Sequence, residues 1–256
     1  MDASQDHNKI IRQAAREVLE PLGLFQKGQS RMWIDDNGWF LILVEFQPSG
    51  FSKGSYLTVA ISYLWESDPS FAGLSFNYPV GGGSRQNNFV PFTGDGAAFY
   101  EAMTAMAQKA ASLVEEYRKF RDLSYARNEI LSIKRNTSHD ILNMLMICGL
   151  AKDPLVEKLY RQLYERLTWS QQNYSRSFQS DFEFADSLDS VVHDPGLFQA
   201  RIVELINERR NYLHTKPSYK KLDPAPYAPP SLLPPPYSPP PPKKVPWWRF
   251  WDPYNF

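Results

Sequence analysis

The sequence is poor in cysteine and histidine, the side chains that most often hold transition metals. Its single cysteine, Cys148, excludes an internal disulfide and a zinc site built from several thiolates. Cys148 lies in the apolar run ILNMLMICGL, so we expect it to be buried as a small hydrophobe. No histidine has a second histidine four residues away, so we expect no metal site and no cofactor. The four histidines are His7, His139, His193 and His214.

No charge of one sign dominates, since 28 Lys and Arg residues balance 28 Asp and Glu residues. A general nucleic-acid binder would carry a basic excess, so we expect no nucleic-acid partner. The N-terminus, MDASQDHNKIIRQAAREVLEP, lacks the apolar core of a secretory signal, and no window approaches 18 apolar residues. We therefore expect a cytoplasmic protein without a transmembrane helix.

Motifs that would mark a catalytic site are also missing. The segment GLFQKGQS at 23–30 nearly fits the P-loop pattern, but Gln29 stands where the phosphate-binding lysine is required. It also follows a helical pattern and precedes a strand pattern, whereas a P-loop follows a strand and precedes a helix. No G-x-S-x-G nucleophile motif is present. We predict no catalytic residue, and whether the protein is an enzyme stays open.

Hydrophobic periodicity predicts an α+β fold with an antiparallel meander of four to five strands. A helical stripe over 6–20 gives way to period-two alternation over 31–47, interrupted by Asp36-Asn37-Gly38, which is typical of a tight hairpin. A third strand is expected over 55–65. Residues 73–80 and 85–92 are expected to form a fourth and a fifth strand, with prolines that suit only sheet edges.

The second half of the folded region reads as helical. The longest helix is expected over 95–120, where apolar residues from Phe99 to Phe120 recur at steps of three and four. Further helical patterns span 122–133, 138–150, 153–168 and 197–214, and the polar stretch 170–190 reads as a loop or a weak helix. We expect an α+β domain at 1–134, a helical extension at 135–215, a proline-rich linker at 216–246 and an aromatic tip at 247–256.

Two stretches resemble an uncharacterised bacterial family. They are LEPLGLFQKGQSRMWIDDNGW at 19–39 and VEFQPSGFSKGSYLTV at 44–59, which match the patterns LxPLGLxQKGxSRxWxDDxGW and VEFQPSxxxxGSYLxV. The likeness covers about residues 8–65 and does not reach the tail. Because the family's function is unknown, the resemblance implies a bacterial cytosolic α+β domain and transfers no catalytic residue.

Polar residues within the predicted strands indicate a candidate ligand site. One sheet face carries large apolar side chains, whereas the other ends in a carboxylate and an amide, which need partners if buried. We predict a shallow pocket on this second face. An alternative is that Arg31 pairs with Glu45 across the hairpin and fixes its register. The predicted pocket residues are Arg31, Trp39, Glu45, Gln47, Tyr56 and Thr58.

The C-terminal segment differs abruptly in composition, since 14 of the 21 prolines lie after Lys216. Proline lacks an amide donor and fixes φ, so we expect a disordered, semi-rigid polyproline spacer. The tip after it carries aromatic and basic side chains of the kinds that dominate interface hot spots. We predict that the tip binds a partner through Trp247, Trp248, Arg249, Phe250 and Trp251.

Four interpretations of the tip remain open. It docks on a partner protein, folds back onto a groove of its own body, inserts at a membrane interface beside Lys243 and Lys244, or is a merely tolerated end. The sequence favours a protein-interaction or scaffold protein whose partner and oligomeric state it does not reveal. The alternatives are a small-molecule-binding or enzymatic domain that uses the open sheet face, with the tail as a lid, and an immunity-type binding protein.

Overall fold

The computed structural model describes residues 7–65, 74–78, 86–133, 137–175 and 177–229. The predicted aromatic tip and most of the predicted proline-rich linker lie outside these residues. The described residues form an α+β fold, as the sequence predicts.

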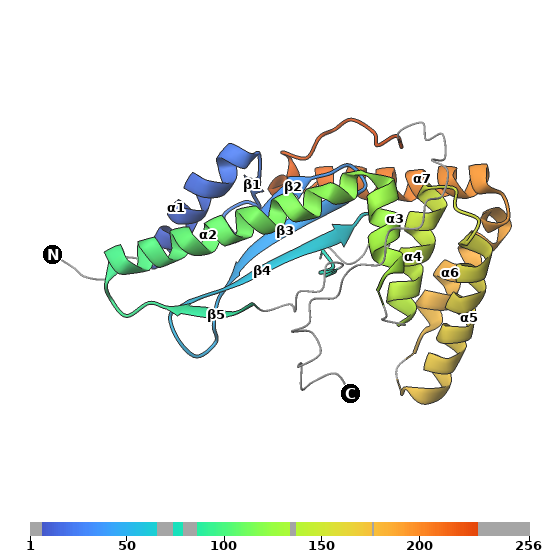
Figure 1. Cartoon of the computed structure of the whole chain (residues 1–256), viewed down its shortest axis with the longest axis horizontal. Helices are drawn as coiled ribbons and strands as arrows, with labels where there is room; N and C mark the ends of the chain where they lie inside the picture. Colours follow the sequence, from blue (N-terminus) through green and yellow to red (C-terminus); the bar gives the residue numbers. More distant parts are fainter. Residues whose placement is uncertain (1–6, 66–73, 79–85, 134–136, 176, 230–256) are drawn as a thin grey trace, which may run out of the picture.

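A five-stranded antiparallel sheet is the centre of the N-terminal half (Figure 1). Each strand pairs with the next one along the chain, so the predicted meander is confirmed. The short first strand was not predicted. The hairpin over 31–47 and the strands over 55–65 and 85–92 were predicted. Residue Asn77 of the predicted fourth strand forms only an isolated bridge to Ile61. The strands are β1 (Phe25–Gln26), β2 (Met32–Asp36), β3 (Phe40–Gln47), β4 (Gly54–Tyr63) and β5 (Gln86–Pro91).

Two helices cover one face of this sheet. Helix α2 (Gly96–Arg118) crosses the sheet lengthwise, and α1 (His7–Leu19) packs beside it (Figure 1). Asp95 caps the start of α2 by accepting hydrogen bonds from two backbone amides. The predicted apolar stripe of α2 is largely buried; at its C-terminal end Val114 is buried, whereas Leu113, which continues the steps of three and four, is only partly buried.

Within the described residues, five further α-helices form the C-terminal half. Four of them gather beyond one end of the sheet, and α7 runs back toward the β2–β3 turn (Figure 1). The polar stretch left open by the sequence contains a full helix, α6, whose Ala185, Leu188 and Val192 are buried. The helices are α3 (Leu123–Leu131), α4 (Ser138–Leu150), α5 (Val156–Asn173), α6 (Gln179–Val192) and α7 (Pro195–His214).

Sheet and helices share one core. The indole nitrogen of Trp65, just after β4, donates to Asn143 of α4 over 3.1 Å, and Asn143 in turn donates to Asn77 over 3.3 Å. The buried apolar side chains of both halves form one continuous cluster. Cys148 of α4 belongs to it, which confirms its predicted burial. Among the described residues, no helix has the length and apolar character needed to cross a membrane.

Residues 216–229, which we call the strap, return from the end of α7 along the sheet. A short 3₁₀ turn over Pro217–Tyr219 begins the strap, and Tyr219 and Leu222 are only 3% and 2% exposed. The predicted linker was expected to begin at 216 as a solvated spacer, whereas the structure packs its first part onto the body. The reason is that apolar side chains stand between the first prolines and can reach the core.

Candidate functional site

The turn between β2 and β3 is the point at which the sheet meets the helical half. Its residues are Asp35, Asp36, Asn37 and Gly38, with Gly38 at a φ of +80°, a value that favours glycine. Successive side chains of a strand point to opposite faces of the sheet. The two adjacent carboxylates therefore point to opposite faces, where each contacts a different helix.

Asp35 contacts the end of α2. The Arg118 guanidinium donates to its two carboxylate oxygens over 2.9 and 2.8 Å and also to the Leu22 carbonyl oxygen over 2.6 Å. Hydrogen bonding to Asp35 raises the pKa of Arg118, so the guanidinium stays charged at every accessible pH. Arg121 adds a second contact by donating to the side-chain oxygen of Asn37 over 2.5 Å. The N-terminal layer of helices is thus fixed to the turn.

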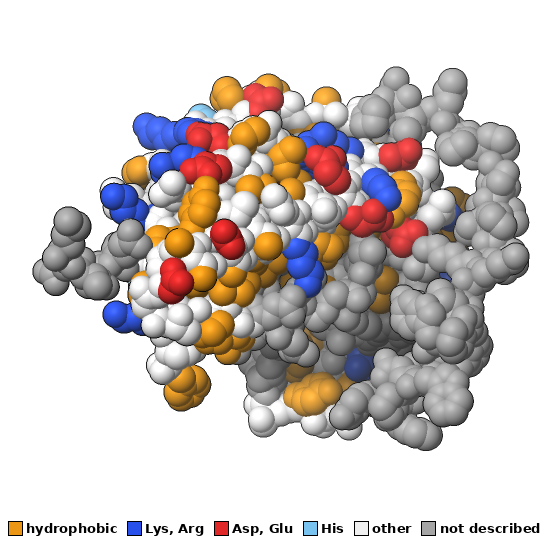
Figure 2. Space-filling view, turned by 60° about the vertical axis from the view of Figure 1, so that its left-hand side comes forward, with side chains coloured by type: hydrophobic (Ala, Val, Ile, Leu, Met, Phe, Trp, Pro, Cys, Tyr) orange, Lys and Arg blue, Asp and Glu red, His pale blue; other side chains and the backbone are white. Residues whose placement is uncertain are grey.

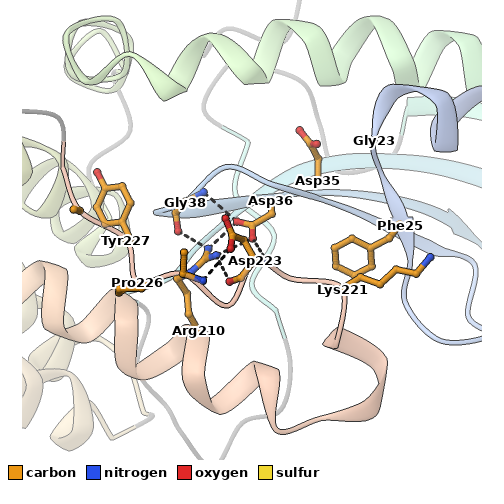
Figure 3. A pocket seen from close by; sticks show the side chains of 12 residues that line it. Gly23, Phe25, Asp35, Asp36, Gly38, Arg210, Lys221, Asp223, Pro226 and Tyr227 are labelled. Atoms are coloured by element: carbon orange, nitrogen blue, oxygen red, sulfur yellow. Dashed lines mark hydrogen bonds and ion pairs between the residues drawn. The ribbon is translucent and has the colours of Figure 1, made fainter.

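Asp36 contacts α7 through a bidentate pair of the same kind. The Arg210 guanidinium donates to its two oxygens over 2.7 and 2.9 Å (Figure 3). The same guanidinium also donates to the carbonyl oxygens of Gly38 and Asp223, over 2.9 and 2.7 Å. The Asp223 amide closes the ring by donating to Asp36 over 3.0 Å. One arginine thereby joins the sheet, the last helix and the strap.

A cleft of about 460 Å³, which we call the turn cleft, lies between this cluster and the strap (Figure 3). Phe25 forms an apolar wall, and Lys221 and Tyr227 of the strap lie at its two ends. The backbone of Tyr227 is held by Asn207 of α7 through hydrogen bonds of 2.7 and 3.1 Å. The volume is within the range of small-ligand pockets.

The chemistry of the turn cleft favours binding over catalysis. Both carboxylates of the turn are engaged by arginines, so neither is a free general base in this arrangement. Burial raises the pKa of the Tyr227 hydroxyl to about 12, so it stays neutral near pH 7. Within the described ranges, no group of three His, Cys, Asp or Glu side chains is placed to hold a metal ion.

The structure brings four of the predicted pocket residues together. Glu45 lies opposite Thr58 and Gln47 opposite Tyr56 in the β3–β4 pairing, so these side chains share one sheet face. Gln47 donates to Glu45 over 3.1 Å, and Thr58 is buried. Their predicted role in ligand binding stays a prediction.

The other two predicted residues lie elsewhere. Trp39 precedes β3 and stacks with Tyr63 and Trp65 at ring-centre distances of 5.9 and 5.4 Å. It is roughly 20 Å along the strand from Glu45, since a strand rises about 3.3 Å per residue. Arg31 lies opposite Phe46 on the other sheet face and donates to Asn8 of α1, so the expected Arg31–Glu45 pair is replaced by this contact.

The sequence alone does not indicate the Asp–Arg contacts of the turn. Period-two alternation does place Asp35 and Asp36 on opposite faces, because the two residues are adjacent in a strand that ends at the Asn-Gly turn. Their partners, Arg118 and Arg210, are 83 and 174 positions away, and no local pattern links them to the turn. The predicted tip residues 247–251 lie outside the described residues.

The surface seen in Figure 2 carries basic, acidic and apolar side chains intermixed over its described part, as the balanced composition suggests. Comparisons of the chain with protein-family models, with curated proteins and with solved structures give no match. The resemblance to an uncharacterised bacterial family therefore stays a prediction.

Proposed function

We propose that this protein is an interaction protein whose C-terminal aromatic tip binds a partner protein. The folded body holds the start of the proline-rich segment at a fixed position, and the segment carries the tip away from that position. The observation that supports this proposal most directly is the attachment of the strap to the sheet and to α7 by Arg210 and Asn207.

The attachment supports the proposal because it gives the tether a defined origin. Hydrogen bonds reach the chain as far as Tyr227, directly before the densest run of prolines. In a polyproline conformation of about 3.1 Å per residue, residues 230–246 would carry the tip about 50 Å from that origin. A stiff tether loses less conformational entropy on binding than a flexible one, which favours capture of a partner.

The chemistry of the tip defines the partner surface. Each docked aromatic ring buries about 150–250 Å², so four rings bury enough area for micromolar affinity even after association costs. Lys243, Lys244 and Arg249 add positive charge to the same stretch. The partner is therefore expected to offer an apolar groove with acidic side chains at its rim.

Affinity capture from an extract of the source cells tests this function. The baits are the full chain, residues 1–229, and a full chain with Trp247, Trp248, Phe250 and Trp251 replaced by alanine. We expect one protein to be enriched on the full chain alone and to be released by a synthetic peptide of residues 243–256. The proposal also requires that the unfolding temperatures of the three baits agree, because a tip that binds a separate partner adds nothing to the stability of the body.

Two results would contradict the proposal. Equal enrichment on all three baits would place any partner surface on the body. Capture by phospholipid vesicles that depends on the four aromatic residues, with no protein enriched, would replace the partner protein by a membrane interface.

A further inference from the structure

The start of α4 and the end of α5 border a hollow that we call the α5 pocket. Its volume is about 430 Å³, which is within the range of small-ligand pockets. Of its seven described lining residues, five carry a hydroxyl group, one is an arginine and none is acidic. The residues that matter for its chemistry are Ser138, Arg166, Ser170, Tyr174 and Phe178.

Ser170 of α5 offers a hydroxyl group that the chain itself does not use. The residue is only 4% exposed and lies in the pocket wall. A serine within a helix commonly donates back to the carbonyl oxygen four residues earlier, as Ser112 of α2 does to Gln108. The Ser170 hydroxyl forms no hydrogen bond with a described residue, yet its oxygen is not fully enclosed by the protein. Because buried hydroxyl groups are nearly always paired, this one indicates a partner in a bound molecule.

Arg166, four positions before Ser170, supplies the charge of the pocket. Its guanidinium carbon lies 4.1 Å from the ring centre of Trp169, and this contact fixes the orientation of the side chain. The guanidinium is partly buried and forms no ion pair with a described residue, in contrast to Arg118 and Arg201 on other helices. The charge of Arg166 is therefore left for a ligand.

The start of α4 adds partial positive charge to the same pocket. Thr137 caps this helix and Ser138 is its first residue. The Asp140 carboxylate bonds to Thr137 and is not among the described lining residues. A helix start, an arginine and free hydroxyl groups together favour an oxyanion, which offers several acceptor oxygens and the complementary charge.

The rest of the lining includes two aromatic side chains. The ring centres of Tyr174 and Phe178 lie 6.3 Å apart. Phe178 is 3% exposed, whereas Tyr174 is 54% exposed. A flat apolar group placed against these rings would cover exposed aromatic surface, which favours a ligand with an aromatic ring.

We propose that the α5 pocket binds a small aromatic molecule that carries a phosphate or carboxylate group. The oxyanion pairs with Arg166 and accepts hydrogen bonds from the hydroxyl groups of Ser138 and Ser170, while the aromatic ring lies against Tyr174 and Phe178. This site is separate from the proposed tip function and holds whether or not the tip binds a partner.

Isothermal titration calorimetry of the full chain with phenyl phosphate tests the site. We expect saturable binding, weaker binding of inorganic phosphate, which lacks the ring, and no binding of benzyl alcohol, which lacks the charge. A parallel titration with benzoate tells whether a carboxylate takes the place of the phosphate. In a ¹⁵N-labelled sample, the amide signals of Ser170 and Phe178 should move with the same affinity, which places the ligand in this pocket.

Three variants provide the matched comparison. Arg166→Gln is expected to weaken the binding of phenyl phosphate about tenfold, and Ser170→Ala about threefold. Ser170→Ala should leave the unfolding temperature unchanged, because its hydroxyl forms no hydrogen bond within the described chain. Arg161→Gln removes an exposed arginine of the same helix that does not line the pocket, and its affinity should match that of the unmodified chain.

Three results would overturn the proposal. The first is that neither phenyl phosphate nor benzoate binds with saturation. The second is that inorganic phosphate or benzyl alcohol binds as tightly as phenyl phosphate. The third is that Arg166→Gln binds phenyl phosphate as well as Arg161→Gln does.

Discussion

The Asp36 carboxylate and the Arg210 guanidinium form two parallel hydrogen bonds of 2.7 and 2.9 Å, although 174 positions separate them in the chain. The contact joins the first long hairpin of the sheet to the last helix. Because the same guanidinium also donates to Asp223, the position of the strap depends on this pair. The pair is therefore expected to contribute both to global stability and to the order of the strap.

Arg210→Lys tests this pair because lysine keeps the charge but cannot bond both carboxylate oxygens and two carbonyl oxygens from one planar group. We expect the free energy of unfolding to fall by about 2 kcal/mol, since the lost hydrogen bonds involve charged groups that are largely buried. Urea denaturation measures the change. Amide hydrogen exchange should also become faster at 221–227.

Arg201→Lys is the matched control on the same helix. Arg201 pairs with Glu204 at an exposed i, i+3 position, so its replacement should change stability by less than about 0.5 kcal/mol. Similar losses for the two variants, or unchanged exchange in the strap, would show that Arg210 does not hold the strap.

Asp35→Asn tests the contact on the opposite sheet face. The substitution removes the negative charge beside Arg118, whose guanidinium is mostly buried. The substitution is expected to cost about 2–3 kcal/mol, because Arg118 then keeps only the more exposed carboxylate of Glu115 as a charged partner. Glu101→Gln on exposed α2 surface should be nearly neutral in the same urea experiment. A loss for Asp35→Asn as small as that of the control would contradict the assigned role of the pair.

Gly38→Ala tests the approach of the strap to the turn. A Cβ at Gly38 would lie 2.9 Å from Cδ2 of Tyr227, and φ is +80°. Gly23 has a similar φ of +89° but open space around its would-be Cβ. Gly23→Ala should therefore cost about 1–2 kcal/mol from backbone strain alone, and Gly38→Ala should cost more.

The excess cost of Gly38→Ala should disappear when Tyr227 is replaced by alanine, because the clash is then removed. Thermal unfolding of the two glycine variants, each with Tyr227 intact and each combined with Tyr227→Ala, completes the comparison. An excess that persists in the Tyr227→Ala background would place the cause elsewhere than in the strap.

The buried thiol of Cys148 is expected to lower the free energy of unfolding at alkaline pH. Burial raises the pKa of its thiol from the ordinary value of 9.0 to about 12. Between these values the unfolded chain loses the thiol proton and the folded chain keeps it, so unfolding becomes more favourable as pH rises. At pH 10 this loss amounts to about 1.4 kcal/mol relative to pH 7.

Cys148→Ala should remove that part of the pH dependence, while the tyrosines with raised pKa values contribute equally in both proteins. Urea denaturation at pH 7 and at pH 10 gives, for each protein, the free energy of unfolding that is lost between the two pH values. Equal losses in the two proteins would show that the folded thiol ionises as readily as the unfolded one. A thiol reagent should also fail to label Cys148 at pH 8 unless the chain unfolds.

The sequence predicts strands β2 to β5 and most helices because their signals are local. The Asn-Gly hairpin, the alternation along β3 and the apolar stripe of α2 each lie within a short window. Helix α6 does not stand out in the same way, since its stretch is mainly polar and only Ala185, Leu188 and Val192 reach the core. Packing against α5 and α7 stabilises it, and that packing is not visible in its own sequence.

Sites that depend on distant partners could not be predicted in the same way. The sheet face shared by Glu45 and Thr58 follows from the alternation along each strand and from the strand register, so the sequence predicts it. The contacts of Arg118 and Arg210, and the return of the strap over β1 and β2, depend on the complete fold. The proline content after Lys216 predicts a solvated spacer, whereas Tyr219 and Leu222 are buried and attach the strap to the core.

Hydrogen exchange with mass spectrometry on the isolated full chain tests the central claim most directly, namely that the tip is available for a separate surface. The account predicts that amides of residues 247–251 exchange within seconds, while those of β3 and α4 stay protected for orders of magnitude longer. Residues 221–227 should show intermediate protection because Arg210 and Asn207 hold them. Protection of the tip equal to that of β3 in the isolated monomer would contradict the account, because the aromatic side chains would then belong to the protein's own core.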